Sequence, residues 1–521
     1  MALFKVENLS FTYRGETKKA LDCVSFEIGQ GETSALIGKS GSGKTTLLRM
    51  LKPSVRPKGD MFGDIIYYGG NGECETGFLF QNPADQSVCD NVFDELCFGL
   101  QNMGLPRDSI RLRVAEICAF FGLEEFLHRS VSELSGGEVQ LVNLAAAAAL
   151  SPSAILLDEP FAQLDPISCD RLKNALLKLK NELGTALIIS SHSIENILTF
   201  TDRVIVLENG KVVKNGSTDC VISELKAKHD PLYKTAGELC SIPGGSVIKT
   251  VSQAREFLKT NKPGFCKFKK GVASGETLIS ANNIYMRFGK NLPDVLRGVN
   301  FEVKRKTVHG LCGANGSGKT TLMSVLCGVR KPYSGKVKSS VGAVYIPQDA
   351  RLAFVKDTVY EDIKYMCEMS GIDQSVIEQT VSGQEIFYDI KSFFDRHPYD
   401  LSGGEVQKAA LFKAVVCGKK VILMDEPAKG FDPETKQEFV KLVAALKKDH
   451  GIVISSHDME LLASVSDNIS MMFDGGIVSG GEVSDFMLKN RFYTTSLARA
   501  SRGICDGLIA ASQFKCEEAV L

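Results

Sequence analysis

The sequence lacks any apolar run long enough to cross a membrane. The alanine-rich stretch Leu144–Leu150 ends at Ser151-Pro152, well short of the ~20 apolar residues that span a bilayer. The N-terminus also lacks the basic and then apolar regions of a secretory signal. We therefore expect a chain that lies in the cytosol, or that reaches the cytoplasmic face of the cell membrane only through partner subunits.

The sequence also has almost no net charge and no closely spaced pair of cysteines. The 61 basic and 62 acidic residues leave a net charge of −1, whereas a broad nucleic-acid interface is expected to be basic. None of the 15 cysteines forms a C-x-x-C pair, which excludes the commonest zinc and redox spacings. Because Cys312 and Cys327 lie in apolar stretches, we expect reduced and mostly buried thiols.

What the sequence does contain is an internal repeat. Its 521 residues allow two to four domains of roughly 100–200 residues, and repeats of this kind decide the number. Four motifs recur in the same order after about 270 residues, which predicts a duplicated domain. The pairs are GKSGSGKT (38–45) and GANGSGKT (313–320), LSGGEVQ (134–140 and 401–407), DEP (158–160 and 425–427), and SSH (190–192 and 455–457).

The repeat and the composition together predict the domain order. We expect one domain over residues 1–228 and a second over 276–484, joined by a linker at 229–275 that prolines and glycines interrupt. A C-terminal extension without a recognisable motif fills 485–521. Short apolar runs alternate with helical patterns in both copies, which predicts an α/β fold with parallel central strands. The expected strands are 34–37, 154–157, 186–189, 308–311, 421–424 and 452–454, and the expected helices include 168–182 and 433–448.

Each copy contains the pattern G-x-x-x-x-G-K-T between an expected strand and an expected helix. Glycines let backbone N–H groups and the helix N-terminus approach a phosphate closely. We expect Lys44 and Lys319 to reach the β- and γ-phosphates of a nucleotide, and Thr45 and Thr320 to bind Mg²⁺. The nucleotide-binding residues expected here are Gly38, Lys39, Ser40, Gly41, Ser42, Gly43, Lys44, Thr45 and Thr46, and Gly313, Ala314, Asn315, Gly316, Ser317, Gly318, Lys319, Thr320 and Thr321.

Acidic residues follow one apolar strand in each copy. A carboxylate at this place, Asp158 or Asp425, suits Mg²⁺, which prefers hard oxygen ligands. The next residue, Glu159 or Glu426, can orient the attacking water or accept its proton. The sequence therefore predicts hydrolysis of the bound nucleotide.

The segments Ser135-Gly136-Gly137 and Ser402-Gly403-Gly404 precede expected helices, so their N–H groups and hydroxyls offer a second anion site. With the other motifs, they make both halves similar to the ATPase subunits of ABC transporters over nearly the whole chain. The resemblance implies two tandem P-loop NTPase domains, each with a helical subdomain. It also implies head-to-tail pairing within the chain, so that ATP binds between the phosphate loop of one domain and the Ser-Gly-Gly segment of the other.

The resemblance assigns further roles, which the spacing alone does not. It implies stacking on adenine, a Mg²⁺-sensing glutamine, an acid that crosses the domain interface, and a histidine that contacts the γ-phosphate beside the catalytic glutamate. The corresponding residues are Tyr13 and Phe288, Gln81 and Gln348, Asp165 and Asp432, and His192 and His457; the expected catalytic residues are Glu159, His192, Glu426 and His457, and the expected Mg²⁺ ligands are Thr45, Gln81, Asp158, Thr320, Gln348 and Asp425.

Four positions depart from the family pattern. Glu138 and Glu405 replace the usual glutamine, and Leu141 stands where the family often has arginine, which Lys408 replaces conservatively in the second copy. The departure at Leu141 puts one local contact of the first Ser-Gly-Gly helix in question, and the fold is unaffected.

The segment Phe80-Gln81-Asn82-Pro83-Ala84-Asp85-Gln86 narrows the resemblance. It is similar to a segment frequent in energy-coupling-factor importers, which bring vitamins and metal ions into prokaryotic cells, and Lys429–Asp432 resembles another of their segments. Such importers combine two ATPase domains with a transmembrane coupling subunit and a substrate-capture membrane subunit. The substrate itself stays open, because the residues that select it would not lie in this chain.

Two other classes of ABC protein remain open. A fused sugar-importer ATPase usually has one degraded site, whereas both sets of motifs are complete here. A soluble tandem-ATPase translation factor has a long charged helical linker, whereas Pro231, Pro243 and Pro263 interrupt this one. Apolar residues recur at helical spacing within Asn91–Arg129 and Thr358–Asp400. Such a stripe is more often core than interface, but its place beside each predicted glutamine favours docking of a transmembrane partner over RNA, through a groove that accepts a short helix.

Overall fold

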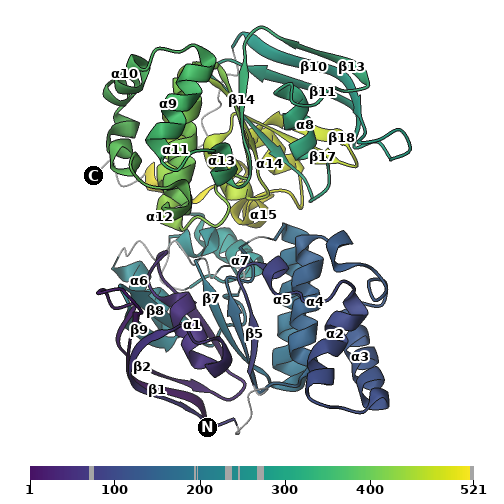
Figure 1. Ribbon diagram of the computed structural model, residues 1–521, viewed down its shortest axis with the longest axis vertical. Coiled ribbons are helices and arrows are strands. Elements are labelled where there is room, and N and C mark those ends of the chain that lie inside the picture. Colours follow the sequence, from purple (N-terminus) through teal and green to yellow (C-terminus); the bar gives the residue numbers. More distant parts are fainter. Residues whose placement is uncertain are drawn as a thin grey trace. The chain divides into compact units, whose positions relative to one another are not determined.

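The computed structural model describes residues 1–69, 76–162, 164–192, 195, 197–228, 237–243, 247–266 and 275–516. The chain divides into two compact units, Met1–Lys249 and Thr250–Leu521. Each unit contains one six-stranded and one three-stranded sheet (Figure 1). The α/β duplication that the motifs predict is therefore confirmed.

The six-stranded sheet of the first unit has the order β5-β6-β7-β3-β8-β9. The strands up to β8 run parallel, and only β9 is antiparallel to its neighbour. β5, β6, β7 and β3 are buried along their whole length, as expected of central parallel strands covered on both faces. The strands are β3 (Thr33–Ile37), β5 (Thr76–Leu79), β6 (Ala154–Asp158), β7 (Ala186–Ser191), β8 (Arg203–Glu208) and β9 (Lys211–Ser217).

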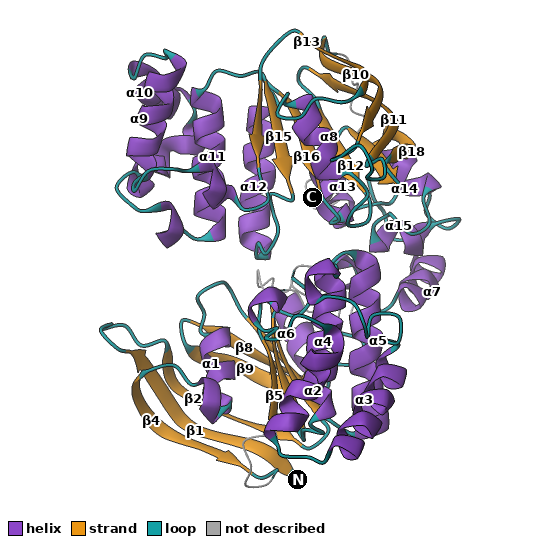
Figure 2. Ribbon diagram, turned by 45° about the vertical axis from the view of Figure 1, so that its right-hand side comes forward, coloured by secondary structure: helices purple, strands orange, loops and turns teal. Residues whose placement is uncertain are grey.

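An antiparallel sheet of order β2-β1-β4 completes the first unit. Helix α1 (Lys44–Leu51) lies between the two sheets (Figure 2). Its Leu47 and Leu48 belong to the same buried cluster as Phe4 of the antiparallel sheet and Leu156 of the parallel sheet. This packing fixes the helix that follows the phosphate loop. The antiparallel strands are β1 (Ala2–Tyr13), β2 (Leu21–Gly29) and β4 (Gly59–Tyr67).

The remaining helices of the first unit cover the parallel sheet or form a helical subdomain. The apolar stripe predicted within Asn91–Arg129 points into the core, since Val92, Leu96 and Leu100 are at most 1% exposed. The hypothesis that this stripe forms a docking groove is therefore wrong, because its residues are used for packing. The helices are α2 (Val92–Asn102), α3 (Arg107–Phe121), α4 (Gly136–Ala149), α5 (Pro166–Leu183) and α6 (Thr218–Ala227).

The second unit repeats this arrangement of strands. Its sheets have the orders β14-β15-β16-β12-β17-β18 and β11-β10-β13. The strands are β10 (Thr277–Met286), β11 (Leu296–Lys304), β12 (Val308–Cys312), β13 (Ser334–Ser339), β14 (Ala343–Ile346), β15 (Val421–Asp425), β16 (Gly451–Ser455), β17 (Asn468–Phe473) and β18 (Gly476–Glu482).

The helices of the second unit follow the order of the first, except that α13, between β16 and β17, has no counterpart among the described helices of the first unit. Val359 and Ile363 of the second predicted stripe are fully buried, so this stripe too is core rather than groove. The helices are α8 (Lys319–Leu326), α9 (Val359–Ser370), α10 (Ser375–Gly383), α11 (Gly403–Val416), α12 (Pro433–Leu446), α13 (Met459–Val465) and α14 (Val483–Lys489), with a 3₁₀ segment at Glu385–Phe393.

Parts of the predicted linker and of the predicted C-terminal extension pack together within the second unit. Helix α7 (Val251–Asn261) lies against α15 (Ser496–Ser501). The guanidinium of Arg255 donates to the backbone carbonyls of Arg499, Ala500 and Arg502 at 3.1–3.3 Å. The linker residues 229–236, 244–246 and 267–274 lie outside the described residues.

The thirteen cysteine side chains that the structure describes are all free. Five of them are buried, including Cys312, whereas Cys327 is half-buried and three are exposed. The expectation that most are buried is therefore wrong. Across the described residues, no helix combines the length and apolar character needed to cross a membrane.

Candidate functional site

The phosphate loop of the first unit closes around its own lysine. The Lys44 ammonium donates to the backbone carbonyls of Gly38 and Lys39, at 2.8 and 3.1 Å. Gly43 has a φ of 102°, and a Cβ there would lie 2.7 Å from the carbonyl oxygen of Ala20. Only glycine therefore fits this turn, which sets the N-terminus of α1 beneath the loop.

The loop of the second unit has the same geometry. The Lys319 ammonium donates to the carbonyls of Gly313 and Ala314, at 2.8 and 3.1 Å, and Gly318 has a φ of 103°. Both lysines are at most 7% exposed. In each unit the loop thus holds a buried cation on backbone oxygens, ready to turn toward an anion.

Both loops also contain a buried hydroxyl without a partner. Ser42 and Ser317 are 5% and 6% exposed, and neither Oγ has a hydrogen-bond partner in the structure. A buried hydroxyl left unpaired is costly. A phosphate oxygen in the loop would satisfy it, so the loops fit a bound polyphosphate.

A threonine hydroxyl and a carboxylate lie together at the start of α1. Thr45 Oγ1 donates to Asp158 Oδ1 at 3.0 Å, and Ser190 Oγ donates to the same oxygen at 2.7 Å. Hydroxyl and carboxylate oxygens are the hard ligands that Mg²⁺ prefers. The predicted residues at this point therefore fit a magnesium ion bound next to the phosphate loop.

The second unit has the same arrangement with one additional donor. Asp425 accepts from Thr320 Oγ1 at 2.5 Å and from Ser455 Oγ. In addition, the Tyr345 hydroxyl donates to Asp425 Oδ2 at 3.2 Å. The residue at the same place in β5 is Phe78, so the two carboxylates do not have the same surroundings.

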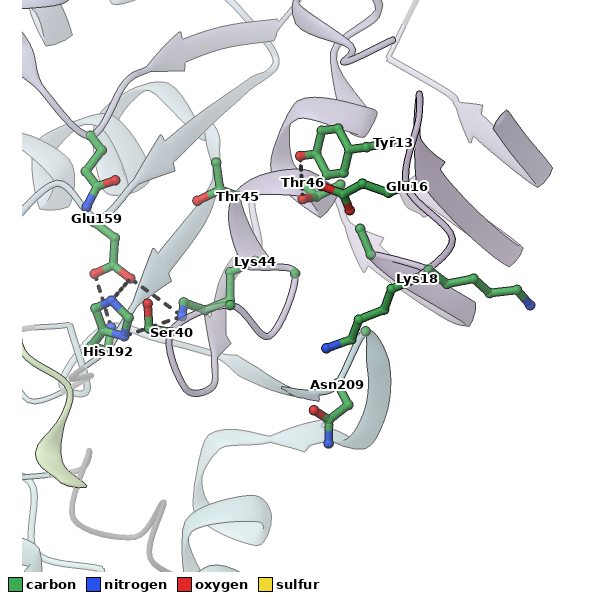
Figure 3. Close-up of a pocket in the computed structure, with 16 residues that line it drawn as sticks. Tyr13, Glu16, Lys18, Ser40, Lys44, Thr45, Thr46, Glu159, His192 and Asn209 are labelled. Atoms are coloured by element: carbon green, nitrogen blue, oxygen red, sulfur yellow. Dashed lines mark hydrogen bonds and ion pairs between the residues drawn. The ribbon is translucent and has the colours of Figure 1, made fainter. Parts of the chain in front are cut away.

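Glu159 lies at the junction of the predicted groups of the first unit. Its Oε1 is 3.2 Å from His192 Nε2 and 3.8 Å from Lys44 Nζ, and its Oε2 accepts from the backbone N–H of His192 at 3.1 Å. Figure 3 shows the three side chains converging beside Ser40. The strand-end glutamate and histidine, predicted as a catalytic pair, are therefore neighbours.

The same pair forms in the second unit. Glu426 Oε2 is 3.0 Å from His457 Nδ1. Burial is the largest effect on His457 and works against its protonated form, but the hydrogen bond to Glu426 and the negative charges of Glu426 and Asp458 together outweigh it and raise the pKa of the histidine. In the first unit, burial raises the pKa of Glu159 to about 7, against the opposing effect of Lys44. A carboxylate with a pKa near neutrality is suited to proton transfer.

An open pocket of about 350 Å³ brings these residues together in the first unit (Figure 3). Tyr13 lies on its rim, and the Tyr13 hydroxyl is hydrogen-bonded to Thr46 Oγ1 at 2.9 Å. The predicted residues that line the pocket are Tyr13, Ser40, Gly41, Gly43, Lys44, Thr45, Thr46, Gln81, Glu159 and His192; the lining residues that the sequence did not single out are Glu16, Lys18, Lys19, Ala20, Asn209 and Gly210.

Phe288, the predicted counterpart of Tyr13, has different surroundings. Its side chain is 55% exposed, and the Arg330 guanidinium lies 4.7 Å from its ring centroid. Without a hydroxyl, Phe288 cannot repeat the bond from Tyr13 to Thr46. The two aromatic positions are thus open to a flat ligand but are held in different ways.

The predicted glutamines follow the edge strands of the two parallel sheets. Gln81 comes after β5 and lines the pocket, whereas Gln348 comes after β14. In the first unit, Gln86 fixes the start of this loop by accepting from Phe80 N at 2.9 Å and donating to the Phe78 carbonyl at 3.1 Å. The distinctive segment of residues 80–86 therefore has a local structural role.

Ser135 and Ser402 cap the helices α4 and α11. Each forms a capping box with the acid three residues later: the N–H of Ser135 donates to Glu138 at 2.7 Å, and that of Ser402 to Glu405 at 2.8 Å. Both serines are exposed. The glutamates that replace the family's usual glutamine thus serve as capping residues, a role the sequence pattern S-x-x-E could have indicated.

The position that departs from the family pattern is a packing site in the first unit. Leu141 on α4 is 8% exposed, whereas Lys408 on α11 forms an ion pair with Asp389.

The predicted interface acids, Asp165 and Asp432, are the N-terminal caps of α5 and α12. Asp165 accepts from Ser168 N at 3.1 Å, and Asp432 accepts from Thr435 N at 2.8 Å.

Sequence reasoning missed three residues around the two carboxylates. Ser190, Ser455 and Tyr345 all donate to Asp158 or Asp425. Ser190 and Ser455 are the first residues of the repeated SSH motif, whose histidines the sequence analysis singled out. Nothing local marks them as partners of an acid about 30 residues earlier, because the contact depends on strand pairing.

Comparisons with known proteins agree with this geometry. A family described as ABC transporter matches residues 21–162 and 296–429. A provisionally named ABC transporter ATP-binding protein of Bacillus cereus is 35% identical, over 96% of this chain and 95% of its own length. A provisionally named HMP/thiamine import ATP-binding protein of Bacillus subtilis is 27% identical, over 92% and 91%.

A solved structure also resembles the whole chain. The archaeal ribosome recycling factor aABCE1, in complex with ribosomal stalk protein aP1, matches with a TM-score of 0.62 and 20% identity, over 92% of this chain and 91% of its own. At this identity the similarity concerns the fold alone.

Proposed function

Since the chain belongs to the ABC transporter family, with two fused ATPase domains, we propose that it energises a prokaryotic membrane importer of the energy-coupling-factor type. The protein is an ATPase. The observation that carries the ATPase part of the proposal is that in both units the strand-end glutamate meets a histidine and the strand-end aspartate meets the threonine of the phosphate loop. A subunit with two such sites is equipped to hydrolyse two ATP molecules.

In this proposal the phosphate loops bind the ATP phosphates. Backbone N–H groups around Gly38–Thr45 and Gly313–Thr320 face the β- and γ-phosphates, and Ser42 and Ser317 gain the acceptors that they lack. Lys44 and Lys319 turn from their backbone carbonyls to the phosphate oxygens. The adenine stacks on Tyr13, which lines the pocket of the first unit, or on Phe288, whose side chain is 55% exposed.

Mg²⁺, when bound, neutralises charge on the phosphates and helps to orient them. The residues that would hold it are Thr45, Asp158 and Gln81 in the first unit, and Thr320, Asp425 and Gln348 in the second. The contacts from Thr45 to Asp158 and from Thr320 to Asp425 support this assignment.

Hydrolysis requires a positioned water and stabilisation of charge on the γ-phosphate. We assign Glu159 and Glu426 to orient the water and take its proton, and His192 and His457 to contact the γ-phosphate. Their distances of 3.2 and 3.0 Å support these paired roles. The Ser-Gly-Gly segments 135–137 and 402–404 would complete the site of the opposite domain, and Asp165 and Asp432 would lie at that interface.

The importer assignment rests on the chain's resemblances. The segment 80–86 is similar to that of energy-coupling-factor ATPases, and a relative covering most of this chain is named for HMP/thiamine import. The proposed partners are a transmembrane coupling subunit and a substrate-capture membrane subunit. Through them the chain would be held at the cytoplasmic face of the cell membrane, with ATPase domains at 1–228 and 276–484.

Isolation of the native complex tests this proposal. The chain, carrying an affinity tag, is purified from detergent-solubilised native membranes, and its partners are identified by mass spectrometry. Integral membrane subunits at stoichiometric amounts support the importer. Ribosomal proteins in their place would instead favour a translation factor. A membrane permease of the sugar-importer type would favour a fused sugar-importer ATPase.

A Lys44→Ala/Lys319→Ala variant tests the assignment of the two loops. It should lose ATP binding and hydrolysis while its circular dichroism spectrum stays that of the parent. Full ATP binding by this variant would contradict the proposed site.

A further inference from the structure

One buried serine hydroxyl in each unit joins the two acidic residues of the proposed site. In the first unit Ser190 Oγ donates to Asp158 Oδ1 at 2.7 Å and accepts from the backbone N–H of Glu159 at 2.9 Å. Asp158 and Ser190 are direct neighbours across β6 and β7. The hydroxyl therefore donates its proton to the aspartate and accepts a hydrogen bond from the glutamate backbone.

The second unit repeats both hydrogen bonds. Ser455 Oγ donates to Asp425 Oδ1 and accepts from the N–H of Glu426 at 3.1 Å. Asp425 and Ser455 are again paired across neighbouring strands, β15 and β16. Ser190 and Ser455 are both 0% exposed, so no water competes for these bonds.

The glutamates need such support because their backbones are strained. Glu159 and Glu426 have φ angles of 48° and 45°, in the left-handed region that residues with a side chain rarely adopt. In this conformation each glutamate turns back toward the histidine, which it meets at 3.2 Å in the first unit and 3.0 Å in the second. The serine hydroxyl accepts a hydrogen bond from the glutamate N–H in both units. In the second unit the same N–H of Glu426 also donates to the backbone carbonyl of Ser455 at 3.1 Å, so the hydroxyl bears more of the turn in the first unit.

We propose that Ser190 and Ser455 are positioning residues for hydrolysis: each holds its glutamate in the left-handed turn that aims the carboxylate at the attacking water. The proposal rests on the assignment of Glu159 and Glu426 made above and extends it to the serines. Alanine at either position keeps the backbone and the Cβ of the serine and removes the hydroxyl alone.

The variant Ser190→Ala/Ser455→Ala removes both hydroxyls. We expect kcat for ATP hydrolysis to fall about 10- to 100-fold, as misplacement of a reacting group by a fraction of an ångström to an ångström does. The dissociation constant for ATP, measured by equilibrium binding of a fluorescent ATP analogue, should change by less than about 3-fold, because the phosphate loops are unaltered.

Two further variants control for a merely structural effect. Ser190→Thr/Ser455→Thr keeps the hydroxyls and should recover most of kcat. Ser34→Ala removes another fully buried hydroxyl from the neighbouring strand β3, where Ser34 donates to Glu32 rather than to the acids of the site; its kcat and ATP affinity should stay those of the parent.

Parental kcat in the double alanine variant would overturn the proposal, and so would a loss of ATP affinity that accounts for the whole loss of activity. A threonine variant as slow as the alanine variant would also contradict it. Glu159→Gln/Glu426→Gln, measured in parallel, separates this failure from that of the proposed function. If the glutamine variant is inactive while the alanine variant is not, only the role of the serines is lost.

Discussion

Tyr345 donates a hydrogen bond to Asp425 at 3.2 Å, and its counterpart in the first unit, Phe78, has no hydroxyl with which to do so. Both residues occupy the third position of the edge strand next to the aspartate's strand. The two nucleotide sites thus differ beside a residue that we assign to Mg²⁺. This difference lies outside the motifs by which the two copies look equivalent.

The first prediction is that Tyr345→Phe weakens Mg²⁺ binding at the second site only. Hydrogen bonds that orient a ligating carboxylate contribute to metal affinity, so the Mg²⁺ concentration for half-maximal nucleotide binding should rise about 3- to 10-fold. A Lys44→Ala background restricts the measurement to the second site. In a Lys319→Ala background the same substitution should have no effect, and an effect there would show that the hydroxyl acts through the fold.

The second prediction is that both sites hydrolyse ATP. Glu159→Gln and Glu426→Gln each replace the carboxylate that we assign to the water, so hydrolysis at that site should slow by a factor on the order of 10²–10⁴. Each variant should still bind ATP, because the loop and its lysine remain. Single-turnover measurements in each variant test this, and parental turnover in either would show that its site is not catalytic.

The third prediction concerns the Ser-Gly-Gly segments. If the domains pair head to tail, Ser135→Arg should disable the site of Lys319, and Ser402→Arg the site of Lys44. Photo-cross-linking of an ATP analogue at each lysine measures the two sites separately. Loss of labelling in the same unit as the substitution would contradict the head-to-tail arrangement.

The fourth prediction is a pH dependence of stability that arises from His309 on β12. Loss of hydration lowers the pKa of His309 to about 4, and Lys304 adds to this effect. The unfolded chain, with an ordinary histidine pKa near 6.5, binds the proton first as the pH falls. His309 therefore reduces stability progressively between about pH 6.5 and pH 4, by up to about 3 kcal/mol.

His309→Gln removes this titration and retains a polar side chain opposite Ser470, which lies 2.9 Å from the ring. The free energy of unfolding of the second unit, measured with urea at pH 7 and pH 4.5, should fall less in the variant than in the parent. Other groups titrate equally in both proteins, so the difference isolates His309. An identical fall would contradict the prediction.

The fifth prediction is that Arg255 stabilises the second unit through the C-terminal segment. Arg255→Ala removes hydrogen bonds to three carbonyls at 499, 500 and 502. Hydrogen bonds from a charged group contribute about 1.5–3 kcal/mol, so the variant should unfold at a lower temperature. Lys259→Ala, at an exposed position of the same helix, is the control, and an equal effect of both would argue against the anchoring role.

Features that are encoded within short segments could be predicted from the amino-acid sequence. The glycines, lysine and threonine of each phosphate loop lie within one short segment that follows a buried strand and begins a helix. The sequence pattern therefore predicts the phosphate-binding groups directly. The apolar runs predicted the central strands to within one or two residues, as at Thr33–Ile37 and Val421–Asp425. The repeat predicted the duplication, because two copies of one chemistry require two copies of its scaffold.

The tertiary structure decided what depends on residues far apart in the chain. The bonds from Ser190 to Asp158 and from Tyr345 to Asp425 exist because strand register places them side by side. The left-handed turn at Glu159 has no sequence signal, since it is held by that same serine. The apolar stripe of α2 fits core and groove equally well by periodicity, and only the packing of α2 against α4 made it core, because burial is a property of the partner as much as of the helix.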